Sequence, residues 1–200
     1  CIVQARMGSS RLPGKVMKKI ANKFLLDYVL DQLKSSKRIE KIFVATTTLP
    51  MDNLICEHLS SKNIAFFRGS PDDVLDRYFQ CAKFFSIDTI VRITADNPLI
   101  DPNIVDLVIN KYNNTTCDYG TNCLPRTFPY GTEVEIFSFE KLHQVWLNAK
   151  KSSEREHVTP YFYNHPELFK IINLKNSKNI SNLRWTIDRE NDLKLFQTIV

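Results

Sequence analysis

Three cationic side chains and several small residues follow the first predicted strand of the chain. Ile2 and Val3 begin a short apolar run, and Arg6, Arg11 and Lys15 come next, in a segment rich in Gly and Ser. A loop of this composition supplies free backbone N–H groups and fixed positive charge, which are what a polyphosphate requires. The segment therefore favours phosphate binding over the alternative, a turn that carries solvated cations.

The spacing of this loop differs from that of a Walker A motif. The Walker motif places four residues between its glycines and a Ser or Thr after its Lys. Here five residues separate Gly8 from Gly14, and Val16 follows Lys15. The hydroxyl that binds Mg²⁺ in a Walker loop is therefore missing.

Two aspartates at the ends of predicted strands are candidate magnesium ligands. Asp96 follows the strand predicted at 88–94, and Asp188 closes a strand predicted at 183–187. Mg²⁺ usually takes one or two carboxylates and completes its shell with water and phosphate oxygens, so two isolated aspartates are enough. The alternatives are a turn residue for Asp96 and a helix N-cap for Asp188, and the residue patterns leave both open.

Candidate contacts for a second, anionic substrate occur in the latter half of the chain. Arg126 and Tyr130 belong to a turn bounded by prolines, Glu133 follows it, and His157 lies in a short polar segment. A His in this setting could act as a general base or contact the substrate, and half-buried packing is the alternative. Exposed loop residues are the alternative for Arg126 and Tyr130. No Ser-His-Asp arrangement or other nucleophile setting stands out.

Helical and extended patterns alternate through the first 115 residues and position these candidates. Strands are predicted at 2–5, 41–46, 64–67 and 88–94, and helices at 26–33, 52–61, 70–82 and 101–112. Such alternation implies an α/β fold whose mostly parallel central sheet is flanked by helices and built by right-handed crossovers. Ligands of these sheets bind at the carboxyl ends of the strands. The phosphate loop, residues 46–48 and residues 95–98 are therefore expected to share one crevice.

The second half is less regular. A strand is predicted at 132–137, a helix over 142–149, another helix starting near Arg155, and the late strand at 183–187. No repeat, linker or low-complexity tract separates the halves. We therefore expect one domain over 1–200, with a nucleotide-binding half (1–115) and a small lobe on the substrate or dimerisation side (116–200). Because Cys1 lies in a strand and Val200 in a helix, both ends are expected to be trimmed.

Composition narrows the functional class. A hydrophobic content of 43% argues against disorder, and the net charge of +5 suits a small anionic ligand. No basic stripe points to nucleic acid, and no apolar run of about 18 residues points to a membrane. The five cysteines form no C-x-x-C pair and are expected to be free thiols in the cytoplasm.

The segment Gln4–Lys15 resembles the A-R-x-x-S-x-R-L-P-G-K signature of cytidylyltransferases that activate acidic sugars. These include the CMP-Kdo and CMP-sialic acid synthetases, and the similarity is greatest to the SpsF group of spore coat polysaccharide biosynthesis. The resemblance covers nearly the whole chain, with further matching segments at 44–46, 68–78, 92–98, 125–135, 155–160 and 186–188.

The resemblance implies a GT-A-like (Rossmann-like) nucleotidyltransferase fold, CTP as co-substrate, Mg²⁺ as cofactor and a homodimer. It implies transfer of CMP to a sugar, sugar acid or phosphorylated polyol, with release of pyrophosphate, for surface polysaccharide synthesis. Arg11, Lys15 and Asp96 would be catalytic, and Asp96 and Asp188 would hold the metal. The nucleotide would contact Gln4, Ala5, Arg6, Gly8, Ser9, Thr46, Arg68 and Thr94. The acceptor would contact Arg126, Tyr130, Glu133 and His157.

One departure and two alternatives accompany this interpretation. Kdo-type enzymes read Gln-Gly-Asp-Glu-Pro where this chain has Thr94–Pro98, so specificity for Kdo or sialic acid is not expected. A GT-A glycosyltransferase would carry Asp-x-Asp, but Asn97 and Pro98 follow Asp96. A nucleotide-binding protein that has lost catalysis is disfavoured by the intact cations and aspartates.

Overall fold

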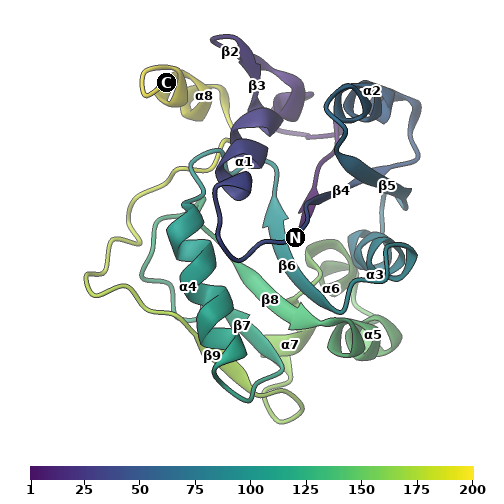
Figure 1. The fold of residues 1–200 in the computed structure, drawn as a ribbon, viewed down its shortest axis with the longest axis vertical. Helices are drawn as coiled ribbons and strands as arrows, with labels where there is room; N and C mark the ends of the chain where they lie inside the picture. Colours follow the sequence, from purple (N-terminus) through teal and green to yellow (C-terminus); the bar gives the residue numbers. More distant parts are fainter.

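A seven-stranded sheet runs through the computed structural model, which describes residues 1–200, and helices cover both of its faces (Figure 1). The strand order is β5-β4-β1-β6-β8-β7-β9. Four strands are mutually parallel: β1 (Ile2–Gln4), β4 (Phe43–Thr47), β5 (Ala65–Gly69) and β6 (Thr89–Thr94). The sheet continues through β8 (Glu135–Ser138), antiparallel to β6, then β7 (Tyr119–Thr121) and β9 (Ile171–Asn173). The predicted α/β fold with a mostly parallel central sheet is confirmed.

Alternating strand residues supply two apolar cores, one on each face of the sheet. In β1, Val3 joins the core with α1, α2 and α4, whereas Ile2 joins the core with α3, α5 and α7. This follows from the period of two along a strand. The helices are α1 (Leu25–Lys34), α2 (Asn53–Ser61), α3 (Val74–Phe84), α4 (Pro102–Asn113), α5 (Phe139–Asn148), α6 (Ser152–His157), α7 (Pro160–Asn164) and α8 (Glu190–Gln197).

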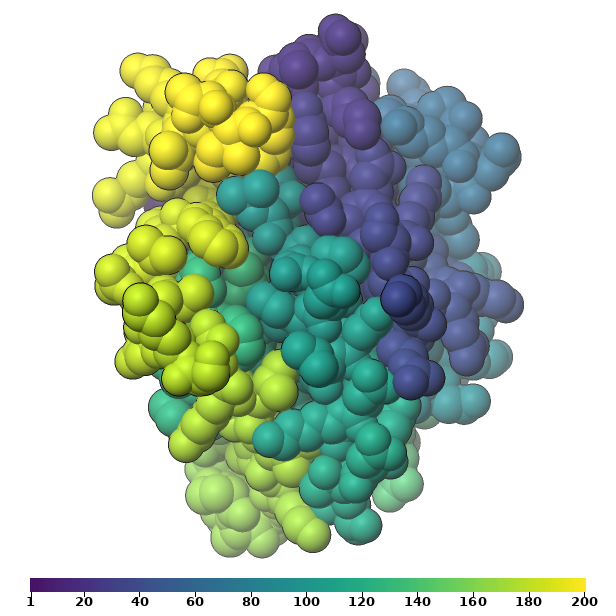
Figure 2. All heavy atoms as spheres, turned by 60° about the vertical axis from the view of Figure 1, so that its left-hand side comes forward, coloured from purple at the N-terminus to yellow at the C-terminus, as the bar shows by residue number.

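A third, smaller core joins the two ends of the chain. It packs Leu193 and Phe196 of α8 against Leu12, Ile20 and Leu25. Ile20 belongs to the hairpin of β2 (Lys19–Ile20) and β3 (Lys23–Phe24). In Figure 2 the yellow C-terminal atoms lie directly against the purple N-terminal ones. This packing holds the segment before α8 beside the loop that follows β1.

Two predicted element boundaries are wrong for reasons of hydrogen bonding. Helix α3 begins at Val74 with Asp73 as its N-cap, because the Asp73 carboxylate accepts from the Asp76 backbone N–H. Ser70, the first residue of the helix predicted at 70–82, instead accepts from the Asp73 N–H and closes the preceding turn. Strand β8 begins at Glu135 and not at 132, because the Asn122 side chain takes the place of a neighbouring strand for the Val134 N–H.

The strand predicted at 183–187 is also absent. Its backbone bridges two loops: Trp185 donates to the Tyr130 carbonyl at 2.6 Å, and Ile187 donates to the Asp96 carbonyl at 2.8 Å. Only the pair of Tyr130 and Arg184 has strand-like geometry. These contacts make the segment a strap that ties the loops together. None of the helices has both the length and the apolar character needed to cross a membrane.

Candidate active site

A cleft of about 290 Å³ lies at the carboxyl ends of β1 and β6. The loop after β1 and residues 95–96 line it together, as the sequence predicts, but residues 46–48 do not. Parallel pairing places Gln4 of β1 beside Thr94 of β6, so the loops that follow the two strands emerge together. The segment before α8 closes the third side. The predicted residues that line this cleft are Gln4, Ala5, Arg6, Gly8, Ser9, Arg11, Lys15, Thr94, Asp96 and Asp188.

Lys15 lies at the base of the cleft and is almost fully buried, with 8% of its surface exposed. Its Nζ donates to Asp96 Oδ2 at 2.7 Å, to Asp188 Oδ1 at 2.9 Å and to the Ile187 carbonyl at 2.8 Å. Gly14 precedes it with φ 68°, a left-handed conformation that favours glycine, and so turns the chain inward. Residues from three distant segments thus converge on one ammonium group.

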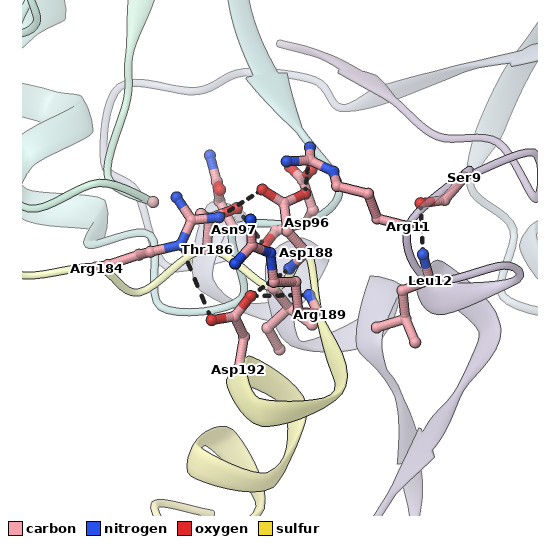
Figure 3. A network of polar contacts seen from close by, with 12 residues as sticks. Ser9, Arg11, Leu12, Asp96, Asn97, Arg184, Thr186, Asp188, Arg189 and Asp192 are labelled. Atoms are coloured by element: carbon pink, nitrogen blue, oxygen red, sulfur yellow. Dashed lines mark hydrogen bonds and ion pairs between the residues drawn. The ribbon is translucent and has the colours of Figure 1, made fainter.

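Asp188 is the most heavily paired carboxylate of the cleft. Besides Lys15, it accepts from Arg11 Nη2 at 3.0 Å and from Arg184 Nη2 at 2.5 Å (Figure 3). Burial by itself raises the pKa of Asp188, but the hydrogen bond and charge of Lys15 outweigh it, helped by Arg184 and Arg11, and the pKa is lowered. Asp188 is therefore ionised at neutral pH.

The structure resolves the helix-cap alternative for Asp188. The N-cap of α8 is Arg189, and Asp192 accepts from the backbone N–H groups of Asp188 and Arg189 at 2.9 and 2.8 Å. The Asp188 carboxylate makes no capping bond and faces the cations (Figure 3). Asp96 likewise directs its carboxylate to Lys15.

Two of the predicted nucleotide contacts do not reach the cleft. Thr46 shares its face of the sheet with Val44 and is fully buried. Arg68 on β5 donates to the carbonyls of Thr47 and Leu49 and to the Asn53 side chain, all within 2.9 Å. These bonds hold the loop between β4 and α2. Alternation along β4 and the lateral distance of β5 from β1 explain both placements.

A second cavity, of about 460 Å³, adjoins the cleft and shares Thr94, Asp96 and Asp188 with it. The four residues predicted to contact the acceptor all line this cavity: Arg126, Tyr130, Glu133 and His157. The Arg126 guanidinium lies over the Tyr130 ring, 3.8 Å from its centre, and pairs with Glu133 at 2.5 Å. The structure therefore brings an aromatic ring and an arginine–glutamate pair next to the paired aspartates.

Gly131 allows the strap of residues 183–187 to form one wall of this cavity. It has φ 100°, and a Cβ atom there would lie 2.5 Å from the Thr186 nitrogen. Only glycine accommodates this close approach of two backbones. The strap carries Arg184, a cavity residue that sequence reasoning missed because its segment looked like a strand.

A buried carboxylate at the floor of the second cavity was also missed. Glu135 appeared as the polar half of an alternating strand, yet it is 7% exposed. It pairs with Arg92 and accepts from Tyr119 Oη at 2.5 Å and Thr159 Oγ1 at 2.6 Å. Arg92 also donates to Gln4 Oε1 at 3.0 Å, so this network joins the floors of both cavities. The only sign of this buried network in the sequence was a charged residue, Arg92, within an apolar strand.

Comparison with known proteins gives consistent matches along the whole chain. A family model described as cytidylyltransferase matches residues 1–197. The spore coat polysaccharide biosynthesis protein SpsF of Bacillus subtilis is 31% identical over 205 residues, covering 99% of this chain and 84% of SpsF.

Solved structures extend these matches. A cytidylyltransferase from Leptospira borgpetersenii superimposes with a TM-score of 0.93 at 38% identity, covering 98% of this chain and 84% of that one. A CMP:2-keto-3-deoxy-manno-octonic acid synthetase complexed with CTP gives a TM-score of 0.72 at 13% identity, covering 99% and 96%. The latter similarity extends to the fold alone, and the predicted nucleotidyltransferase fold is confirmed.

Proposed function

The chain belongs to the cytidylyltransferase family, and from this premise we propose that it transfers CMP from CTP to an anionic, sugar-like acceptor and releases pyrophosphate. The observation that carries the proposal is the convergence of Asp96 and Asp188 on the buried Lys15 ammonium. This group lies between a cleft lined by phosphate-binding residue types and a cavity lined by arginine and tyrosine.

The triphosphate would bind along the loop that follows β1. Arg11 uses one nitrogen to contact Asp188 and leaves 59% of its side chain exposed, so its other donors are free to meet phosphate oxygens. Lys15 would turn from the aspartates to the same phosphates. Both cations would then neutralise the charge that develops on the departing pyrophosphate.

The donor set fits Mg²⁺. Asp96 and Asp188 each place a carboxylate oxygen within 3 Å of the Lys15 ammonium, so they already hold a cation between them. Two carboxylates plus phosphate oxygens are a usual Mg²⁺ environment. When bound, the metal would supply Lewis-acid polarisation of the phosphate oxygens. Asp96 and Asp188 would hold the metal, and Lys15 would then be available to bind phosphate.

The chemistry requires little covalent work from the protein. An oxygen of the acceptor attacks the α-phosphorus of CTP, a new O–P bond forms, and the bond from phosphorus to the β-phosphate oxygen breaks with its electron pair on pyrophosphate. If the attacking group is a hydroxyl, its proton leaves to a base, and His157 lines the acceptor cavity. The role of the protein would be to hold the two reactants in line.

The acceptor would occupy the second cavity. Arg126 and Arg184 line it with side chains that are 20% and 42% exposed, and Tyr130 offers a ring against which a sugar packs. This composition supports an acidic or phosphorylated sugar. By similarity to SpsF, whose name refers to spore coat polysaccharide biosynthesis, we extend the proposal to surface polysaccharide synthesis. A homodimer in the cytoplasm stays a prediction.

The glycosyltransferase alternative loses support because Pro98 stands in the place of the second acid of Asp-x-Asp. The intervening Asn97 amide donates to Thr94 Oγ1 and Glu133 Oε2 at 3.0 and 3.1 Å. It thus orders the acceptor side and adds no negative charge for a metal. Glycosyl transfer from a sugar nucleotide without CTP consumption would contradict our proposal.

The decisive experiment measures pyrophosphate release with four nucleoside triphosphates crossed with a panel of acidic and phosphorylated sugars, with and without Mg²⁺. We expect turnover with CTP that a chelator abolishes. Asp96→Asn should lose about 10²-fold or more of it while circular dichroism stays unchanged. Pyrophosphate release by Asp96→Asn at the wild-type rate, or tight CTP binding without turnover on every acceptor, would overturn the proposal.

A further inference from the structure

One buried arginine beside the nucleotide cleft has no partner in the protein. Arg77 lies on α3 and is 1% exposed, and its Nε and Nη1 atoms are buried without a hydrogen bond. The stem of the side chain packs over Gly69 of β5, where a Cβ atom would come within 3.1 Å of Arg77 Cγ. The fold therefore makes room for this arginine and leaves its donors unsatisfied.

The electrostatic setting confirms that Arg77 is poorly compensated. Burial is the largest effect and lowers the pKa of Arg77; Tyr78 opposes it, the charge of Arg6 lowers the pKa further, and Asp52 and Asp73 oppose these effects more weakly. A buried guanidinium without acceptors is unfavourable, and native structures retain such groups where a ligand completes them. Asp73 is unavailable as a direct partner, because Arg155 occupies its carboxylate at 2.5 and 2.8 Å.

Arg77 lines a third cavity, of about 190 Å³, that opens from the phosphate cleft. The two share Gln4, Ala5, Arg6 and Glu156, so a ligand can extend continuously from one into the other. With the phosphates at Lys15, the rest of a nucleotide has this cavity on one side and the acceptor cavity on the other. The position suits a nucleobase.

We propose that Arg77 binds the base of the nucleotide and selects cytosine by donating to its O2 and N3 atoms. This inference rests on the proposed function and adds a specificity-determining residue to it. Two neighbouring acceptors on one edge of cytosine match the paired N–H groups of a guanidinium, as adjacent acceptors on guanine do in DNA recognition.

The same geometry rejects uracil. Uracil carries a hydrogen on N3, so one donor of Arg77 would face another donor and remain unsatisfied. Leaving a buried donor unpaired is costly, whereas the cytosine edge satisfies both. Glu156 lines the cavity with a carboxylate that can accept from the 4-amino group of cytosine and would repel the O4 atom of uracil.

The test compares equilibrium binding of CTP and UTP, in the presence of Mg²⁺, to the wild type and to Arg77→Met. We expect the wild type to favour CTP by about ten- to hundredfold and the variant to lose most of that preference. Arg77→Lys keeps the charge but not the paired donors and should also lose it. It provides the same test if the methionine variant does not fold.

Lys83→Met is the matched control, because Lys83 is an exposed cation of the same helix, α3, and lines neither the phosphate cleft nor the third cavity. Its ratio of CTP to UTP affinity should equal that of the wild type. Wild-type selectivity in folded Arg77→Met or Arg77→Lys would overturn the role of Arg77 and leave the proposed function intact. If the wild type binds no nucleoside triphosphate, the proposed function fails, and the inference fails with it.

Discussion

Lys15 and Arg77 are both buried cations beside the same cleft, yet their surroundings are opposite. Lys15 has three acceptors within 2.9 Å, two of them carboxylates, whereas Arg77 has no hydrogen-bond partner in the protein. If the proposed function holds, Lys15 exchanges protein partners for phosphate oxygens when the nucleotide binds. Arg77 has no hydrogen-bond partner in the protein to lose, so its donors are available to a neutral acceptor.

The difference fits the two tasks that we propose for the cleft, which are to bind a charged triphosphate and to recognise a neutral base. A strongly charged triphosphate can displace an aspartate from Lys15, because the exchange replaces one ion pair with another. A neutral base cannot compete with a carboxylate, so the group that reads it has to be kept free. We therefore expect pairing at the phosphate side and an unpaired donor at the base side.

The largest effect should come from Lys15→Met. Loss of the ammonium removes charge stabilisation of the departing pyrophosphate and should lower kcat by about 10²–10³-fold. Steady-state pyrophosphate release with CTP and a productive acceptor measures it. The control is Lys18→Met, which removes the cation of an exposed pair with Glu190, 3.4 Å long, and should retain most of the activity. Equal losses of activity in both variants would contradict a specific role of Lys15 in the reaction.

Substitution of Lys15 and substitution of Arg77 should affect the free energy of unfolding differently. Lys15→Met leaves Asp96 and Asp188 facing each other and should lower the free energy of unfolding by about 2 kcal/mol or more, allowing for the partial exposure of Asp96. Arg77→Met removes an unpaired buried charge and should leave that free energy unchanged or raise it by about 1 kcal/mol. Urea unfolding without nucleotide measures both, and a loss of several kcal/mol in Arg77→Met would contradict the comparison.

The smallest effect concerns a paired carboxylate away from the cleft. Asp27 on α1 is bonded to His58 at 2.7 Å, and also to Lys62 and the Phe24 N–H. Burial raises the pKa of Asp27, but the hydrogen bonds from His58 and Lys62 outweigh it, and the net pKa is lowered.

Because the folded pKa of Asp27 lies below the unfolded one, its stabilising contribution is complete above about pH 4 and is lost as pH falls through the folded value. The difference in unfolding free energy between wild type and Asp27→Asn should therefore shrink below about pH 4. Asp31→Asn, on the exposed side of the same helix, is the control and should show a smaller change. Parallel curves for wild type and Asp27→Asn down to pH 2 would contradict this pairing.

Sequence patterns predicted the parallel half of the sheet and the loop that follows β1, because both depend on local periodicity and composition. They also indicated Asp96 as a candidate site residue, because it follows an apolar strand. They failed at residues 183–187, where β-branched residues favour a strand but the backbone bonds to loops at Tyr130 and Asp96. Glu135 was missed because its burial depends on Arg92, Tyr119 and Thr159 from other elements.

Residue order was sufficient to predict an α/β fold and a cationic loop after β1, since strand periodicity, helix caps and small-residue loops act over a few neighbours. The nucleotidyltransferase fold followed from the family resemblance. Residue order could not distinguish Lys15 from Arg77. Pairing of Lys15 depends on a strap more than 170 residues away, and isolation of Arg77 depends on how α3 packs over β5. Both are long-range packing outcomes, so only the three-dimensional arrangement shows that one cation is paired with carboxylates and the other is left without a partner.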